Sequence, residues 1–107
     1  MENYYAAIEA FHKKHEMKGT NNEDMTFRLN LLIEELGELA EVVTKGKSRK
    51  DFIEENVDIF NLIVGNLISM GITLDEFDSV FWEKHARIME RKKRNVNGKF
   101  RVSEFKQ

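Results

Sequence analysis

The sequence predicts an all-α fold whose protomer consists of four helices. Apolar residues recur at the three-to-four spacing of packed helices in four long stretches, and short breaks rich in glycine and asparagine separate these stretches. The chain contains no cysteine, which excludes a disulfide framework, a thiolate nucleophile and a cysteine zinc site. With 107 residues it builds only one small core, so we expect a second copy to cover the remaining apolar surface in a helical-bundle oligomer.

Capping residues and glycines give the expected limits of each helix. Gly19 lies in the first break, Gly46 ends the second stretch, and Gly71 ends the third. Ser48 is suited to cap the third helix, and Thr73 with Glu76 three residues later forms the capping-box pattern that opens the fourth. We therefore expect helices over about 2–17, 23–44, 49–70 and 74–94.

The C-terminal end differs from the rest in charge and in pattern. From Lys84 onward there are nine lysines and arginines against two acids, a net +7, whereas the first 83 residues carry a net −9. Such asymmetry suggests a phosphate-bearing or nucleic-acid partner.

The tail also contains a turn signal. Asn97-Gly98 is typical of a type I′ turn, which suggests a short hairpin. We expect a helical domain over 1–94 and a basic tail over 95–107.

The sequence indicates a cytoplasmic protein with no membrane partner. The longest uncharged stretch, 59–74, is shorter than the roughly 20 apolar residues that span a bilayer, and it contains asparagine and glycine. The N-terminus lacks the apolar segment of a secretion signal.

Two acids of the second helix lie beside apolar residues rather than opposite them. On a helical wheel, Glu34 and Glu41 face away from the main apolar stripe and are expected in solvent. Glu35 and Glu38 instead lie on its flank, and Arg28, one heptad before Glu35, projects from the same side. The stripe that we expect to form the core is Met25, Leu29, Leu32, Leu36, Leu39 and Val43.

The third helix repeats this arrangement with Glu55 and Asp58. It is apolar almost all round after Asp58, which predicts a helix enclosed by neighbours, and uncompensated carboxylates there would be costly. In one interpretation, each of the two acid pairs forms a salt bridge with a lysine or arginine such as Arg28. The other brings all four carboxylates together across an antiparallel helix pair, where hard oxygen ligands without histidine or cysteine suit Mg²⁺ or Mn²⁺.

The two acid pairs resemble a known motif. The segment 34–41, Glu-Glu-Leu-Gly-Glu-Leu-Ala-Glu, followed by Glu55-Asn56-Val57-Asp58, is similar to the E-x-x-E then E-x-x-D signature of the MazG-like all-α nucleoside triphosphate pyrophosphohydrolases. That superfamily includes dimeric dUTPases and phosphoribosyl-ATP pyrophosphohydrolases, and the resemblance spans about 28–94. It implies a helical homodimer or homotetramer that holds Mg²⁺ and hydrolyses the α–β phosphate bond of a nucleotide, giving the monophosphate and pyrophosphate.

The resemblance also implies roles for individual residues. Glu38 is the first candidate to position the attacking water as well as to bind metal, and Glu35 can exchange roles with it. The basic stripe of the fourth helix would neutralise the β- and γ-phosphates; the alternative is a solvent-exposed face with pairs such as Glu83 and Arg87. Asn61, one turn after Asp58, could touch the sugar or a metal-bound water, or be a buried asparagine satisfied by backbone. The implied metal ligands are Glu35, Glu38, Glu55 and Asp58, and the implied substrate-binding residues are Lys84, Arg87, Arg91, Asn61 and Arg28.

Two rival functions follow from the same residues. A ferritin-like di-iron protein needs two Glu-x-x-His motifs, and the chain has one, Glu9 to His12. A non-enzymatic helical dimer could bind nucleic acid through the basic end, with the acids acting only as salt-bridge partners. We prefer a nucleotide, and not a nucleic acid, as the partner.

The remaining apolar, aromatic and histidine side chains are expected to have structural roles. We expect Phe77, Val80, Phe81 and Ile88 in the core, Trp82 in packing, and His12, His15 and His85 on the surface.

Overall fold

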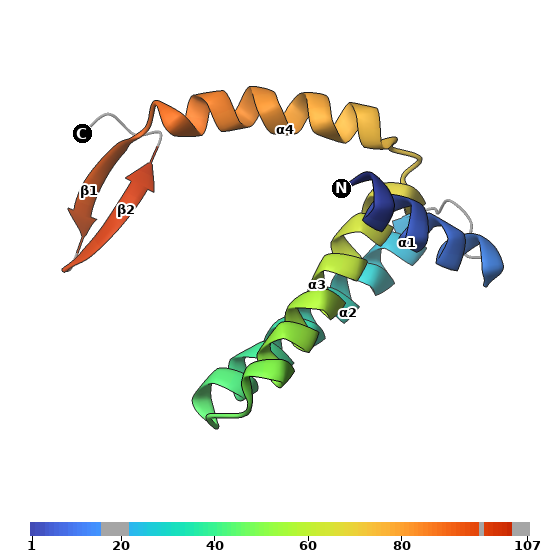
Figure 1. The fold of residues 1–107 in the computed structure, drawn as a ribbon, viewed down its shortest axis with the longest axis horizontal. Helices are drawn as coiled ribbons and strands as arrows, with labels where there is room; N and C mark the ends of the chain where they lie inside the picture. The colour runs from blue at the N-terminus through green and yellow to red at the C-terminus, as the bar shows by residue number, and fades with distance from the viewer. Residues whose placement is uncertain (16–21, 97, 104–107) are drawn as a thin grey trace. The chain divides into compact units, whose positions relative to one another are not determined.

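The computed structural model describes residues 1–15, 22–96 and 98–103. The helices are α1 (Glu2–Lys14), α2 (Asn22–Thr44), α3 (Arg49–Ser69) and α4 (Leu74–Met89), followed by strands β1 (Lys92–Val96) and β2 (Lys99–Ser103) (Figure 1). The four-helix, all-α class is thus confirmed. The chain forms two compact units, Met1–Thr73 and Leu74–Gln107. Among the described residues, no single helix is both long and apolar enough to cross a membrane.

Two helix ends differ from expectation, both at the C-terminal side. α1 ends at Lys14 instead of near residue 17, and the expected stop around Gly19 lies outside the described residues. α4 ends at Met89 instead of near Arg94, because the backbone from Lys92 pairs with a second strand and no longer continues the helix. The strands are antiparallel with Lys92 opposite Ser103 and Val96 opposite Lys99. Gly98, in the two-residue connection, has a φ of 77°.

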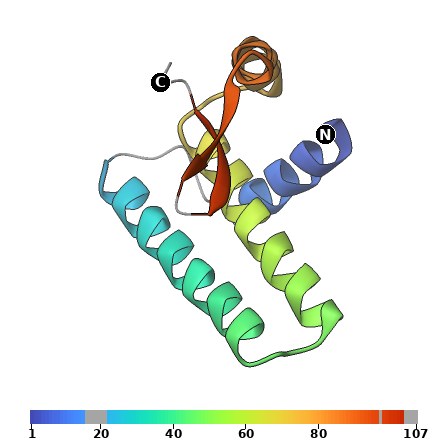
Figure 2. The same ribbon diagram turned by 90° about the vertical axis from the view of Figure 1, so that its left-hand side faces the viewer.

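The link between α2 and α3 makes these helices an antiparallel pair. Gly46 has a φ of 62°, and its N–H donates to Val43 O at 3.3 Å while Lys47 N–H donates to Val42 O at 2.9 Å, which is a Schellman motif. Ser48 then caps α3, because its Oγ accepts a hydrogen bond from Asp51 N–H at 3.1 Å. Figure 2 shows the resulting hairpin of two long helices.

α1 packs against α3 near the C-terminal end of that helix. The Tyr5 hydroxyl donates to the carbonyl of Ile72, and the Tyr4 ring meets Phe60 edge-on with centroids 6.0 Å apart. The buried apolar side chains of the described residues come from all three helices of the first unit. They are Tyr5, Ile8, Val42 and Val64.

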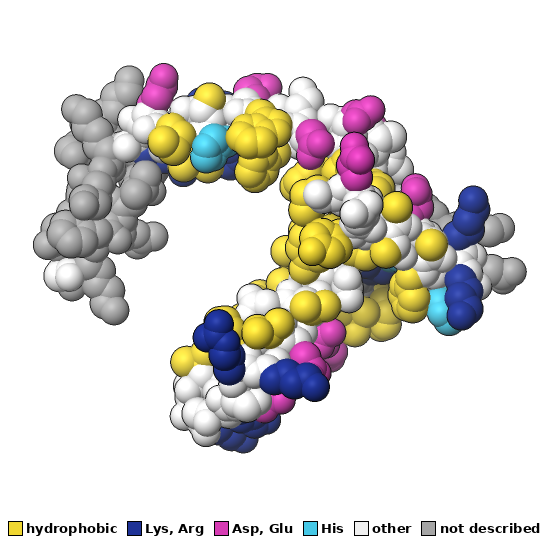
Figure 3. Space-filling model, in the orientation of Figure 1, with side chains coloured by type: hydrophobic (Ala, Val, Ile, Leu, Met, Phe, Trp, Pro, Cys, Tyr) yellow, Lys and Arg dark blue, Asp and Glu magenta, His cyan; other side chains and the backbone are white. Residues whose placement is uncertain are grey.

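The core of α2 is not the stripe that the helical wheel selects. Leu36 and Val43 of that stripe are 50% and 62% exposed, whereas Arg28 and Val42 are buried. The expected enclosure of α3 after Asp58 is confirmed only in part, because Val64, Gly65 and Ser69 are buried whereas Ile63 is exposed. α4 buries none of its residues: Val80, Phe81 and Ile88, which were expected in the core, are exposed, and Phe77 is half-buried. Figure 3 shows hydrophobic side chains on the visible surface of both units.

Candidate active site

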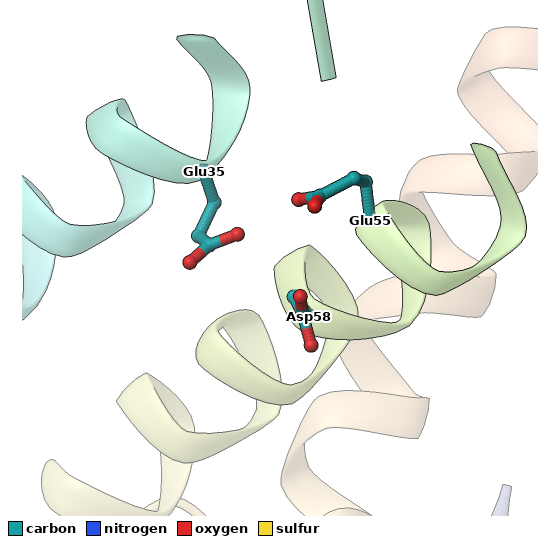
Figure 4. Close-up of side chains that lie close together, drawn as sticks. All are labelled: Glu35, Glu55 and Asp58. Carbon is teal, nitrogen blue, oxygen red and sulfur yellow. The ribbon is translucent and has the colours of Figure 1, made fainter. Parts of the chain in front are cut away.

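The antiparallel pairing of α2 and α3 brings together three of the acids that the sequence singles out. One carboxylate oxygen from each of Glu35, Glu55 and Asp58 lies within 4.8 Å of the other two. Figure 4 shows Glu35 reaching from α2 toward the two acids of α3. Glu35 and Glu55 are half-buried and Asp58 is exposed. We call these three residues the carboxylate cluster.

The cluster concentrates negative charge in a partly desolvated place. Oε2 of Glu35 and Oε2 of Glu55 are buried without a hydrogen-bond partner among the described residues. Burial raises the pKa of Glu35 to about 7, and a hydrogen bond with Glu55 and the charges of Glu38, Asp58 and Glu55 act in the same direction. The cluster by itself therefore disfavours its fully ionised form.

The donor set fits a hard divalent cation. The cluster supplies only carboxylate oxygens, which Mg²⁺ and Mn²⁺ prefer, and no histidine or cysteine belongs to it. A dication there would give the two buried Oε2 atoms the positive partner that they lack in the described structure. Salt bridges do not fill that role in the described structure: Lys45 pairs with Glu41 at 3.5 Å and Lys50 with Glu54 at 3.8 Å, and neither pair includes a residue of the cluster.

Glu38, the fourth expected ligand, stands outside the group of three. It is exposed on α2, one turn beyond Glu35, and its charge contributes to the raised pKa of Glu35. Its charge therefore acts on the cluster, although Glu38 is not one of the three residues whose carboxylate oxygens lie within 4.8 Å of one another. Its expected roles in metal binding and in water positioning stay predictions.

The expected phosphate-binding residues fall into two places. Lys84 and Arg87 are exposed on α4, and Arg91 follows that helix, so all three belong to the second unit. Asn61 and Arg28 belong to the first unit and line a common cavity. Their assignment to substrate stays a prediction in each case.

The structure corrects the interpretation of Arg28 as a salt-bridge partner of the acids. Its Nε–H donates to Asn66 Oδ1 on α3 at 2.7 Å, and no ion pair involving it occurs among the described residues.

The expectation that His12 lies on the surface is also wrong, because this side chain is only 4% exposed. Tyr5, Ile8 and His12 follow the three-to-four spacing of a packed face, and that pattern could have revealed the burial of His12.

Gly65 is the second residue that sequence reasoning missed. A Cβ built on it would overlap Arg28 Nη2 and lie 2.8 Å from His12 Nε2. Arg28 and His12 are 7% and 4% exposed, so an added Cβ would force two buried side chains to shift from their positions against α3. The absence of a side chain at Gly65 therefore lets the Arg28 guanidinium lie against the backbone of α3.

Gly65→Ala is expected to lower the free energy of unfolding by about 1 to 3 kcal/mol, because the added methyl group displaces Arg28 and His12. The matched control is Gly37→Ala on α2, where nothing lies within 4 Å of the added Cβ. That change should raise stability by about 0.5 to 1 kcal/mol through helix propensity. Urea denaturation of both variants measures the difference, and equal effects would contradict the close approach at Gly65.

The fold and the carboxylate cluster define the class of MazG-like all-α pyrophosphohydrolases, hydrolases that act on phosphoric anhydride bonds. The family model described as phosphoribosyl-ATP pyrophosphohydrolase matches residues 3–93. The match covers most of the chain, and the protein belongs to this family. No curated protein and no solved structure gives a significant match. The resemblance that the two acid motifs suggested is therefore confirmed.

Proposed function

We propose that the protein hydrolyses the bond between the α- and β-phosphates of a nucleotide that carries a triphosphate. The reaction uses Mg²⁺ or Mn²⁺ and gives pyrophosphate and the corresponding monophosphate. The family description makes phosphoribosyl-ATP the first candidate substrate. The observation that carries the proposal is the carboxylate cluster, in which three acids of two helices converge and two buried carboxylate oxygens have no hydrogen-bond partner among the described residues.

The chain's own residues divide the work as follows. Glu35, Glu55 and Asp58 would hold the divalent cation, which supplies Lewis acidity toward the phosphate oxygens. Glu38 is exposed one turn from Glu35, where its carboxylate can accept a hydrogen bond from a water and orient it toward the phosphorus. The developing charge on pyrophosphate needs cationic partners, and we assign this role to Lys84, Arg87 and Arg91.

We also propose that the enzyme works as a homodimer or homotetramer. The first unit exposes an apolar groove of about 500 Å³ between α1 and α3, lined by Tyr4, Ile53 and Val57 among others. Exposed apolar surface of this kind supports burial against further copies of the chain. Light scattering of the purified protein measures the assembly, and a monomer at micromolar concentration would contradict it. The cytoplasmic location stays a prediction.

A substrate panel tests the proposed reaction. Phosphoribosyl-ATP, ATP and the deoxynucleoside triphosphates are incubated with the protein and MgCl₂, and ³¹P NMR identifies the products. We expect pyrophosphate and a monophosphate, with no release when EDTA replaces the metal. Orthophosphate as the product would contradict cleavage at the α–β bond. Salt-sensitive binding of DNA or RNA without turnover of any nucleotide would favour the rival nucleic-acid-binding function.

A further inference from the structure

A second cavity of the first unit contains a buried cation. Its volume is about 360 Å³, within the range of small-molecule sites, and helices α1, α2 and α3 all contribute to its lining. Arg28 is only 7% exposed there. We call this space the Arg28 cavity; its lining residues include Phe11, His12, Arg28, Leu31, Asn61 and Leu62.

The charge of Arg28 has no counter-charge in the described structure. Its hydrogen bond to Asn66 Oδ1 uses only Nε–H, and a guanidinium carries further N–H donors on its two Nη atoms. No acidic side chain lines the cavity among the described residues. Burial lowers the pKa of Arg28 by desolvation, which shows the cost of keeping this charge out of water. An anion entering the cavity would remove that cost.

The Arg28 cavity lies next to the carboxylate cluster on the same two helices. Arg28 precedes Glu35 by one heptad on α2, which corresponds to about 10 Å along the helix axis. On α3, Asn61 lies three residues after Asp58 and so on the adjacent turn. A nucleotide whose triphosphate is held at the carboxylate cluster can therefore extend another part of the molecule into the cavity.

We propose that the Arg28 cavity binds a phosphate monoester of the substrate that is remote from the hydrolysed triphosphate, namely the phosphate of the phosphoribosyl group. This inference rests on the proposed function. Arginine suits a phosphate because its planar donors engage two oxygens at once. Asn61 offers a further polar group, while Leu31 and Leu62 provide apolar walls for the sugar. The cavity would then distinguish phosphoribosyl-ATP from ATP, which lacks this group.

Ribose 5-phosphate is the probe that tests the cavity without metal or turnover. Isothermal titration calorimetry on the full chain in EDTA is expected to show binding of ribose 5-phosphate and none of ribose. Asn61→Asp keeps the side-chain shape and puts an acid beside Arg28, so it should weaken binding about tenfold or more through repulsion of the phosphate. Lys45→Met, which removes an exposed cation from the end of α2, is the matched control and should bind as the wild type does.

Arg28→Met separates a ligand-binding arginine from a structural one. We expect it to lose binding of ribose 5-phosphate and to melt at or above the wild-type temperature without ligand, because it removes a buried charge. The proposal is overturned if the wild type does not bind ribose 5-phosphate, or if Asn61→Asp binds it as tightly as the wild type. If Arg28→Met does not fold, the Asn61→Asp result decides alone.

The kinetic readout keeps this proposal distinct from the proposed function. In the hydrolysis assay, Asn61→Asp should lower the preference for phosphoribosyl-ATP over ATP, measured as the ratio of their kcat/KM values, by about tenfold or more. An unchanged ratio with normal hydrolysis would refute the cavity assignment and leave the reaction standing. Binding of ribose 5-phosphate without hydrolysis of any nucleotide would refute the reaction and leave the phosphate site standing.

Discussion

Glu55→Gln is expected to lower metal-dependent hydrolysis by about 100-fold or more. The change removes one of three converging carboxylates and replaces an anionic oxygen donor by a neutral amide, which Mg²⁺ binds far less well. Changes in groups that merely orient metal ligands already cost about 10- to 100-fold, so loss of a direct ligand should cost at least as much. Steady-state release of pyrophosphate over a range of MgCl₂ concentrations measures both the rate and the metal requirement.

The neighbouring acid provides a matched control for this experiment. Glu54 is exposed on the same helix and pairs with Lys50 at 3.8 Å, so Glu54→Gln removes the same charge one residue away from the cluster. We expect its activity to stay within about twofold of the wild type, as is usual for an exposed helix pair of low energy. Equal losses in both variants would show that net charge, and not the carboxylate cluster, supports the reaction.

Glu35→Gln is expected to remove a pH dependence from the stability of the metal-free protein. The pKa of Glu35 is about 7 in the folded chain and 4.5 ordinarily, so the folded state holds this proton more tightly. The resulting stabilisation is complete below the ordinary pKa and is lost as the pH rises through the folded value. The metal-free wild type should therefore lose stability between these two pH values. The variant, which has no proton to lose there, should be the more stable protein at about pH 8.

Urea denaturation in EDTA at several pH values measures this effect, with Glu34→Gln as the control. Glu34 is exposed beside Glu35, and its substitution should leave the wild-type pH dependence intact. Adding MgCl₂ at about pH 8 should stabilise the wild type and the control, because a ligand that binds only the folded state raises its stability. The same stabilisation in Glu35→Gln would contradict the assignment of Glu35 as a metal ligand.

Local patterns were sufficient for the helices and for the choice of acids. The three-to-four spacing and the glycines at 46 and 71 placed α2 and α3 to within a residue or two, since helix ends depend on nearby caps. Four acids were selected because a carboxylate beside apolar residues is costly unless it has a partner, and the structure brings three of them together while Glu38 stays outside the group. A short turn between antiparallel helices then made their approach predictable.

The same patterns failed where two faces of a helix compete. α2 carries apolar residues on both sides, and the wheel cannot tell which side meets α3. The structure buries Val42 and Arg28 and leaves Leu36 and Val43 exposed. The helical pattern also failed at the end of α4. This helix ends at Met89 because Lys92–Val96 pair with Lys99–Ser103 as antiparallel strands, and this pairing competes with the helix.

By itself, the amino-acid sequence determined the helical class, the α2–α3 hairpin and the acids that meet between these helices, because periodicity, caps and the cost of buried charge act over a few residues. Only the tertiary structure decided that Arg28 lies against Gly65 with its guanidinium enclosed and that His12 joins it. Those contacts link α1, α2 and α3, and no local rule predicts which side chains meet when three helices pack.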